Sequence, residues 1–152
     1  MNGLKFIVIS GTTGVTENCY VYEWQDEMIV VDCGVGFPDP EMLGVDLVIP
    51  DFTYLRKNKN KLKGILISHG HEDHLGSLPF LFKDVEVPIY STKLVAGFIE
   101  DKFLDYGMKI PKITVFNPER DTFAVGPFRI SPFRVSHSVP DGVGYCIDTP
   151  IG

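Results

Sequence analysis

The chain has 152 residues, of which 44% are hydrophobic, 12% aromatic and 22% charged. This length and composition are consistent with one globular domain, residues 1–152, that buries a sizeable core. The formal net charge of −6 is not typical of a nucleic-acid binder, which usually carries a basic face. Any contact with nucleic acid would therefore depend on local patches.

The three cysteines and the N-terminus bear on the compartment of the protein. Cys19, Cys33 and Cys146 have no paired spacing, and their odd number favours free thiols in a reducing compartment over a disulfide framework. The apolar stretch at residues 6–9 is too short for a signal peptide or a membrane span. We therefore expect a cytoplasmic protein that does not enter a membrane.

Short β-type runs dominate the first third of the chain. Residues 4–9, 19–24 and 28–32 are rich in Val, Ile and Tyr and are separated by turn-forming residues, which predicts a β-meander. Residues 64–68 are predicted to form a buried strand. The segment 73–82 is predicted to form the helix that follows it.

The remainder of the chain is predicted as one strand, one helix and an all-strand tail. After a strand at residues 88–90, apolar side chains recur at helical spacing through residues 91–106, with Gly107 placed as a C-cap. The tail comprises strands at residues 113–116, 122–125, 128–135 and 143–147. This order of elements predicts an α/β fold with half or more of an αββα sandwich.

The densest group of ionisable side chains follows the strand predicted at residues 64–68. The run Ser-His-Gly-His-Glu-Asp-His at residues 68–74 holds three imidazoles and two carboxylates. Burying so many ionisable groups without partners costs free energy, and a divalent metal ion removes that difficulty. His69 and His71 flank a glycine in a loop that leaves a strand, so both rings can turn toward one ion.

The residue types in this run favour zinc. Imidazole nitrogen suits zinc and carboxylate oxygen is an acceptable further donor, while the lack of paired cysteines argues against a closed structural site. Asp73 and His74 are expected to face a position next to the ion held by His69 and His71. We therefore predict an open, catalytic zinc site, with a solvated helix N-terminus as the alternative.

Two other zinc signatures do not fit the run. The metalloprotease pattern His-Glu-x-x-His fails because only Asp73 lies between Glu72 and His74. The deaminase pattern fails because no Pro-Cys-x-x-Cys follows.

Several segments resemble one known family. The run at residues 69–74 is similar to the H-x-H-x-D-H signature of the metallo-β-lactamase superfamily, and Val-Val-Asp-Cys-Gly at residues 30–34 resembles that superfamily's strand-end Asp motif. Residues 37–55 and 134–141 resemble the bacterial and archaeal ribonuclease J group in particular. The resemblance extends over most of the chain, from residue 6 to residue 152. It implies the layered αββα fold of that superfamily.

Members of the ribonuclease J group carry a β-CASP domain inserted in the metallo-β-lactamase domain. By resemblance, residues 1–152 correspond to the first part of the metallo-β-lactamase domain, without the β-CASP domain and without the later Asp that bridges two zinc ions. We therefore expect a sandwich that is incomplete at its C-terminal side. Residues 11–18 depart from the family's Gly-Glu-Ile-Gly run, which puts substrate contacts from that loop in doubt.

The resemblance also assigns ligands to two zinc ions. His137, which by residue type alone would be a polar surface group, becomes the third ligand of the first ion beside His69 and His71. Asp73 and His74 become ligands of the second ion. We expect one tightly held zinc and an incomplete second site.

Two carboxylates have further roles by resemblance. Asp73 also takes part in the acid/base chemistry of metal-assisted hydrolysis. Asp32, which could otherwise be a cap or a turn former, orients a ligand or the loop backbone.

The implied function is zinc-dependent hydrolysis of RNA phosphodiester bonds, exonucleolytic or endonucleolytic, with weakened activity in this form. One alternative is a hydrolase of small substrates such as a lactam, a lactone or a thioester. A second alternative is a zinc-binding fragment without catalysis.

A basic cluster and a strand edge are the remaining features that bear on partners. The cluster is either a solvated face or a phosphate contact for RNA. The strand at residues 143–147 is expected to leave a sheet edge exposed and to cause self-association. The cluster comprises Arg56, Lys57, Lys59, Lys61 and Lys63.

Overall fold

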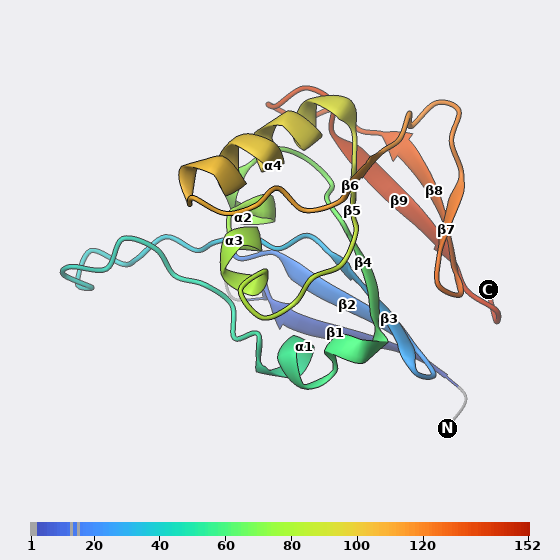
Figure 1. Cartoon of the computed structure of the whole chain (residues 1–152), viewed down its shortest axis with the longest axis horizontal. Helices are drawn as coiled ribbons and strands as arrows, with labels where there is room; N and C mark the ends of the chain where they lie inside the picture. The colour runs from blue at the N-terminus through green and yellow to red at the C-terminus, as the bar shows by residue number, and fades with distance from the viewer. Residues whose placement is uncertain (1–2, 13, 15) are drawn as a thin grey trace.

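The computed structural model describes residues 3–12, 14 and 16–152, and its strands form two sheets (Figure 1). The first sheet has the order β1 (Leu4–Ser10), β2 (Cys19–Trp24), β3 (Glu27–Val31), β4 (Leu62–Leu66), β5 (Ile89–Ser91) and β6 (Ile113–Val115). The second sheet has the order β7 (Phe123–Val125), β8 (Phe128–Arg134) and β9 (Val143–Asp148). The predicted meander is confirmed, because β1, β2 and β3 pair antiparallel. Strands β3 to β6 pair parallel.

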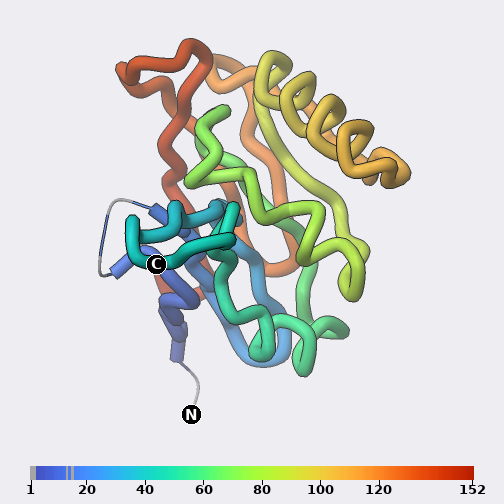
Figure 2. Tube along the Cα trace, turned by 90° about the vertical axis from the view of Figure 1, so that its left-hand side faces the viewer, coloured from blue at the N-terminus to red at the C-terminus, as the bar shows by residue number. Residues whose placement is uncertain are grey.

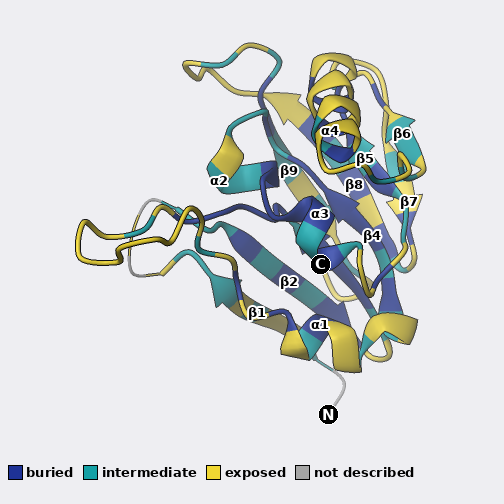
Figure 3. Ribbon diagram, turned by 60° about the vertical axis from the view of Figure 1, so that its left-hand side comes forward, coloured by how far each residue is buried: buried dark blue, intermediate teal, exposed yellow. Residues whose placement is uncertain are grey.

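The helices lie on the face of the first sheet that the second sheet does not cover (Figure 3). They are α1 (Thr53–Lys57), the 3₁₀ turn η1 (Lys59–Lys61), α2 (Glu72–Leu75), α3 (Leu78–Leu81) and α4 (Lys93–Asp105). The layers are therefore helices, first sheet and second sheet, which confirms the expected α/β sandwich. Over the described residues, no helix packs on the far side of the second sheet.

The predicted helix at residues 91–106 and its C-cap are confirmed by α4. Gly107 has φ of +64°, and the backbone N–H groups of Gly107 and Met108 donate to the carbonyls of Leu104 and Phe103 at 2.9 and 2.8 Å. This pair of backbone hydrogen bonds ends a helix at a residue with a left-handed backbone, a conformation that glycine adopts without strain.

The helix predicted at residues 73–82 is interrupted, because the segment forms two short helices, α2 and α3. Ser77 lies between them, where its N–H donates to the carbonyl of Cys33 at 2.9 Å and its hydroxyl donates to the carbonyl of Gly34 at 2.7 Å. Pro79 opens α3 and has no N–H for a continuous helix. Contacts with the strand-end loop therefore break the helix.

Two apolar cores hold the layers together. The larger core lies between the first sheet and the helices, and the smaller core lies between the two sheets. Fully buried side chains of the larger core include Met28, Ile65, Leu78, Ile99 and Phe103. The smaller core comprises Trp24, Ile29, Leu66, Val125, Phe128 and Ile130.

A long excursion of the chain, the 37–47 arm, projects from the body between β3 and α1. Backbone hydrogen bonds between Gly36 and Val48 close its base at 2.7 and 3.1 Å. The arm points toward the viewer in Figure 2 and is largely exposed in Figure 3, with Leu43 91% accessible at its tip.

The described residues contain no helix that is both long and apolar enough to cross a bilayer.

Candidate metal centre

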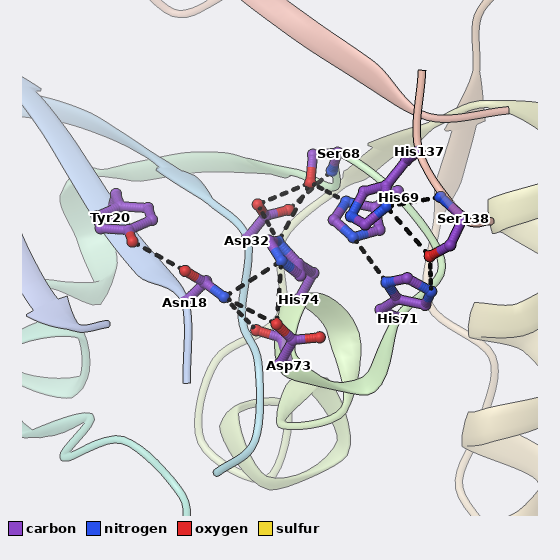
Figure 4. A network of polar contacts seen from close by, with 10 residues as sticks. All are labelled: Asn18, Tyr20, Asp32, Ser68, His69, His71, Asp73, His74, His137 and Ser138. Carbon is purple, nitrogen blue, oxygen red and sulfur yellow. Dashed lines mark hydrogen bonds and ion pairs between the residues drawn. The ribbon is translucent and has the colours of Figure 1, made fainter. Parts of the chain in front are cut away.

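The chemistry-bearing residues gather where two neighbouring parallel strands end. Asp32 follows β3, and the run from Ser68 to His71 follows β4, its parallel neighbour. His137 comes from the loop between β8 and β9, so both sheets contribute to the same place (Figure 4). Carboxyl ends of parallel strands are the usual position of sites in α/β folds, because the loops that leave them converge there.

Three of the predicted residues, His69, His71 and His137, form one cluster. Each histidine offers one ring nitrogen, and the three nitrogens all lie within 4.8 Å of one another. His69 Nε2 and His71 Nδ1 are 3.2 Å apart, and the ring of His137 lies 4.4 and 4.8 Å from the rings of His69 and His71. His69 is buried, His71 is half-buried and His137 is exposed, so the outer side of the cluster is open to solvent.

His69 is the buried member of this cluster. Burial, followed by the nearby charge of His74, lowers the pKa of His69 to about 4. The ring is therefore neutral near pH 7 and keeps a lone pair for a ligand. Its Nδ1 atom lies 2.9 Å from the hydroxyl of Ser68, which in turn donates to Asp32 Oδ2 at 2.8 Å.

Asp32 is buried and contacts both ends of the histidine run at residues 68–74. Its Oδ1 atom accepts a hydrogen bond from the Ser68 N–H at 2.7 Å, and its Oδ2 atom lies 2.8 Å from Nδ1 of His74. Asp32 has φ of +62°, a backbone conformation that Asp and Asn tolerate better than most residues. This turn lets the side chain reach the loop that follows the next strand.

Asp73 and His74 form a second, adjacent group. Asp73 Oδ2 lies 3.2 Å from His74 Nε2. Burial lowers the pKa of His74, but the hydrogen bond and charge of Asp32, and then those of Asp73, outweigh burial and raise it.

Asn18 bridges this second group. Its Nδ2 atom lies 3.2 Å from both Asp73 Oδ2 and His74 Nε2, and it donates to the Asp73 carbonyl at 3.1 Å. The Tyr20 hydroxyl donates to Asn18 Oδ1 at 2.9 Å and so fixes the orientation of the amide. An amide N–H₂ group thus occupies the space between two potential metal ligands.

Backbone hydrogen bonds hold the start of α2, residues 72–74, against the loop that follows β3. The N–H groups of Cys33 and Val35 donate to the carbonyls of His74 and Glu72 at 2.7 and 3.0 Å. A Cβ atom at Gly34 would lie 1.6 Å from the carbonyl oxygen of Asp73. Only glycine fits there, because any side chain would push residues 73 and 74 away.

The structure brings all six predicted site residues to one region, and it adds three that the sequence reasoning missed. Asn18, Tyr20 and Ser68 carry common polar side chains, and only their spatial contacts single them out. Thr13 and Val15, in the segment that departs from the ribonuclease J pattern, lie outside the described residues.

The basic cluster at residues 56–63 lies away from this site. It precedes β4, whereas the histidine loop follows the other end of that strand. Arg56 pairs with Asp84, Lys61 with Glu23 and Asp26, and Lys63 with Glu27. The cluster is therefore a solvated, largely paired face and does not line the histidine site.

Comparisons with known proteins place the chain among relatives by sequence and fold. Ribonuclease J of Mycoplasma pneumoniae is 40% identical over 150 residues, and ribonuclease J 1 of Streptococcus pyogenes is 38% identical over 152 residues. These alignments include 97% and 99% of this chain, but the chain spans only 26% and 27% of those proteins. The metallo-beta-lactamase fold protein YhfI of Bacillus subtilis superposes with a TM-score of 0.65 at 24% identity, over 96% of this chain and 58% of that chain.

The family model described as metallo-beta-lactamase superfamily matches residues 12–152, which is most of the chain. The matched region contains every residue of the histidine cluster and of the Asp32 network. The chain therefore belongs to the metallo-beta-lactamase superfamily.

Proposed function

We propose that the chain is the metal-binding part of a zinc-dependent hydrolase that cleaves RNA phosphodiester bonds. The observation that carries this proposal is the convergence of His69, His71 and His137, whose ligand atoms lie within 4.8 Å of one another at a solvent-open position. Three nitrogen ligands with an open side are the pattern of catalytic zinc sites.

One pair of ring nitrogens has the spacing expected for two ligands of one zinc ion. Two nitrogens that bind one tetrahedral zinc at about 2.0–2.1 Å lie about 3.3–3.4 Å apart. The separation of 3.2 Å between His69 Nε2 and His71 Nδ1 is close to that value. The second ring nitrogen of His69 contacts the hydroxyl of Ser68, which donates to Asp32, an arrangement that orients ligating histidines in metal sites.

Each residue of the network has a proposed task. His69, His71 and His137 hold the first ion, and Asp73 and His74 offer a second, incomplete position that Asn18 partly fills. When bound, zinc supplies Lewis-acid activation of water for hydrolysis at neutral pH. Asp73 accepts the proton of the attacking water at a carboxylate oxygen, and Asp32 keeps His74 and the Ser68 backbone in place.

The names of the relatives support RNA as the substrate, and a hollow beside the histidine site indicates a path for it. A hollow of about 380 Å³ near the histidine site is lined by Lys93, Phe116, Asn117 and Asp121 and by the ion pair of Arg134 with Asp141. Arg134 lies at the end of β8, just before the loop that carries His137, so an RNA strand along this hollow would reach the metal site.

The test is zinc binding and turnover by the purified chain. We expect isothermal titration to give one tight zinc per chain, and zinc-loaded protein to cleave a 5′-labelled single-stranded RNA in a reaction that a chelator stops. A chromogenic lactam in the same assay tests the alternative of a small-substrate hydrolase.

The outcomes separate the three hypotheses about function. Cleavage of the lactam without cleavage of RNA would replace the RNA proposal with the small-substrate hydrolase, and zinc binding without either activity would indicate a zinc-binding fragment. Absence of zinc binding would overturn the proposal as a whole.

A cytoplasmic location and a homo-oligomer also remain proposals, the first supported by three free cysteines.

A further inference from the structure

The loop between β8 and β9 presents His137 yet has few internal anchors. Residues 135–138 are exposed, and His137 itself is an exposed member of the histidine set. Two backbone bonds hold the loop's ends: the Val135 N–H donates to the Gly142 carbonyl at 3.1 Å, and the Val143 N–H donates to the Ser68 carbonyl at 2.9 Å.

Asp141 joins this loop to helix α4. Its carboxylate Oδ2 accepts a hydrogen bond from the Leu94 N–H at 3.4 Å, and its carbonyl accepts one from the Thr92 hydroxyl at 3.2 Å. Thr92 is the N-cap residue of α4, but its own side chain makes no cap bond to the helix. Asp141 therefore supplies, from another part of the chain, the acceptor that an N-cap side chain normally provides.

The anchor is rigid on the helix side. The inward face of α4 is buried in the larger core through Val95, Ile99 and Phe103. On its other oxygen, Asp141 pairs with Arg134 at 3.1 Å, and Arg134 is also held by Glu119 at 2.8 Å. Asp141 thus connects the end of β8, the start of α4 and the loop that carries the third histidine.

The backbone of Asp141 is itself in an uncommon conformation. Its φ of +67° lies in the left-handed region, which Asp and Asn adopt at lower cost than most other residues. Gly142 follows, and a Cβ atom added there would lie 3.6 Å from Cβ of His69. A displacement at Asp141 would be transmitted directly to the position of His137 relative to His69 and His71.

We propose that Asp141 is a positioning residue that fixes the third metal ligand by anchoring the His137 loop to the N-terminus of α4. The inference rests on the proposed function, because it assumes that the three histidines bind a metal ion. It assigns to Asp141 no contact with metal or substrate.

The test compares metal binding by three variants. Asp141→Asn keeps the side-chain size and the left-handed preference but removes the charge. Asp141→Gly keeps the backbone freedom and removes the side chain. Glu119→Gln is the matched control, because it breaks an ion pair of the same Arg134 without touching the loop.

Cobalt(II) and zinc serve as probes of the site. We expect Asp141→Gly to weaken zinc binding about 10- to 100-fold, the usual effect of losing a residue that orients a ligand. Asp141→Asn should weaken it less, because its single amide oxygen can accept only one of the two side-chain hydrogen bonds. Their cobalt absorption bands should weaken relative to the unsubstituted protein, because one nitrogen ligand is less well placed. Glu119→Gln should keep both the affinity and the spectrum, and thermal melting of the metal-free proteins should show that all variants are folded.

Equal zinc affinity and an unchanged cobalt spectrum in both Asp141 variants would overturn the positioning role while leaving the metal site intact. An equal loss in Glu119→Gln would also overturn it, because the effect would then follow from Arg134 and not from the loop anchor. If the unsubstituted chain binds neither metal, the proposed function fails and the inference fails with it.

Discussion

Asp32 Oδ2 lies 2.8 Å from His74 Nδ1, although 42 positions separate the two residues in the chain. The contact exists because β3 and β4 are parallel neighbours whose ends lie side by side. The same carboxylate accepts two further hydrogen bonds from Ser68, one from its N–H and one from its hydroxyl. One buried charge thus orients both halves of the histidine run.

The substitution Asp32→Asn should therefore weaken the site and the fold together. Asn keeps the left-handed backbone but cannot accept hydrogen bonds at both positions, which leaves a buried donor unsatisfied at a cost of about 1–3 kcal/mol. Chemical denaturation of the metal-free protein measures this loss. Asp148→Asn, at an exposed position of β9, is the control and should be neutral; equal effects in the two variants would contradict the network.

Replacing His71 by Ala should abolish tight zinc binding and any hydrolysis but leave the fold largely intact. The side chain is half-buried in a loop and contributes little to either core. Glu72→Gln is the matched control, because Glu72 pairs with Lys102 at 2.6 Å on an exposed surface where such pairs are worth about 0–1 kcal/mol. Elemental analysis after dialysis and an RNA cleavage assay compare the two. Full turnover by His71→Ala would show that the assigned site is wrong.

Asn18→Asp should increase uptake of a second metal ion. The new carboxylate would stand beside Asp73 and His74 as an additional oxygen ligand, whereas without metal it would repel Asp73 and destabilise the fold. We expect a lower melting temperature without metal and a larger rise on adding zinc than in the unsubstituted protein. Tyr20→Phe only releases the amide and should leave the zinc stoichiometry unchanged. A stoichiometry of one in Asn18→Asp would contradict the prediction.

A second buried charge, Glu23, predicts how stability depends on pH. Burial raises the pKa of Glu23, but the hydrogen bonds from Tyr54 and Lys5 and the charges of Lys5 and Lys61 outweigh it and hold the pKa below its usual value. A carboxyl whose pKa is lower in the folded state stabilises the fold above its unfolded pKa, here near 4.5, and this contribution is lost as the pH falls through the folded pKa.

Tyr54→Phe tests this dependence. The hydroxyl of Tyr54, whose pKa is raised to about 12, donates to Glu23. Its loss should cost about 1–3 kcal/mol at neutral pH and move acid unfolding to a higher pH, as measured by thermal melts from neutral to acidic pH. Tyr106→Phe, at an exposed position, should leave the profile unchanged.

We further expect the chain to self-associate. The edge strand β1 exposes Leu4, Phe6 and Val8, and β9 is the edge of the second sheet. Exposed edges and apolar patches pair with other chains unless they are covered. Light scattering at several concentrations, with reductant because Cys146 is exposed, should show a mass that grows with concentration.

Phe6→Lys should reduce this association, because it places a charge on the exposed edge strand. A concentration-independent monomer with a cooperative melt would mean that residues 1–152 close their own core.

The histidine run could be predicted from local sequence, whereas the roles of His137 and Asp32 were expected from the family resemblance. The histidine run follows a strongly apolar strand, and the spacing of Val95, Ile99 and Phe103 defines α4. The break at Ser77 was missed, although Pro79 gave a local signal, because tertiary bonds to Cys33 and Gly34 override helical propensity there. Asn18 was missed for a related reason, since its contacts with Asp73 join residues 55 positions apart.

The parallel pairing of β3 with β4 also has a consequence for folding kinetics. The β1–β2–β3 meander can form from neighbouring residues, but β4 joins β3 only after residues 32–61, including the arm, have closed a long crossover. Such closures carry an entropic penalty before any contact offsets it, which makes non-local strand pairing slow. Asp32 meets Ser68 and His74 only at that step. The metal centre is therefore assembled late, and zinc added to the unfolded chain should stabilise the final state without speeding formation of the meander.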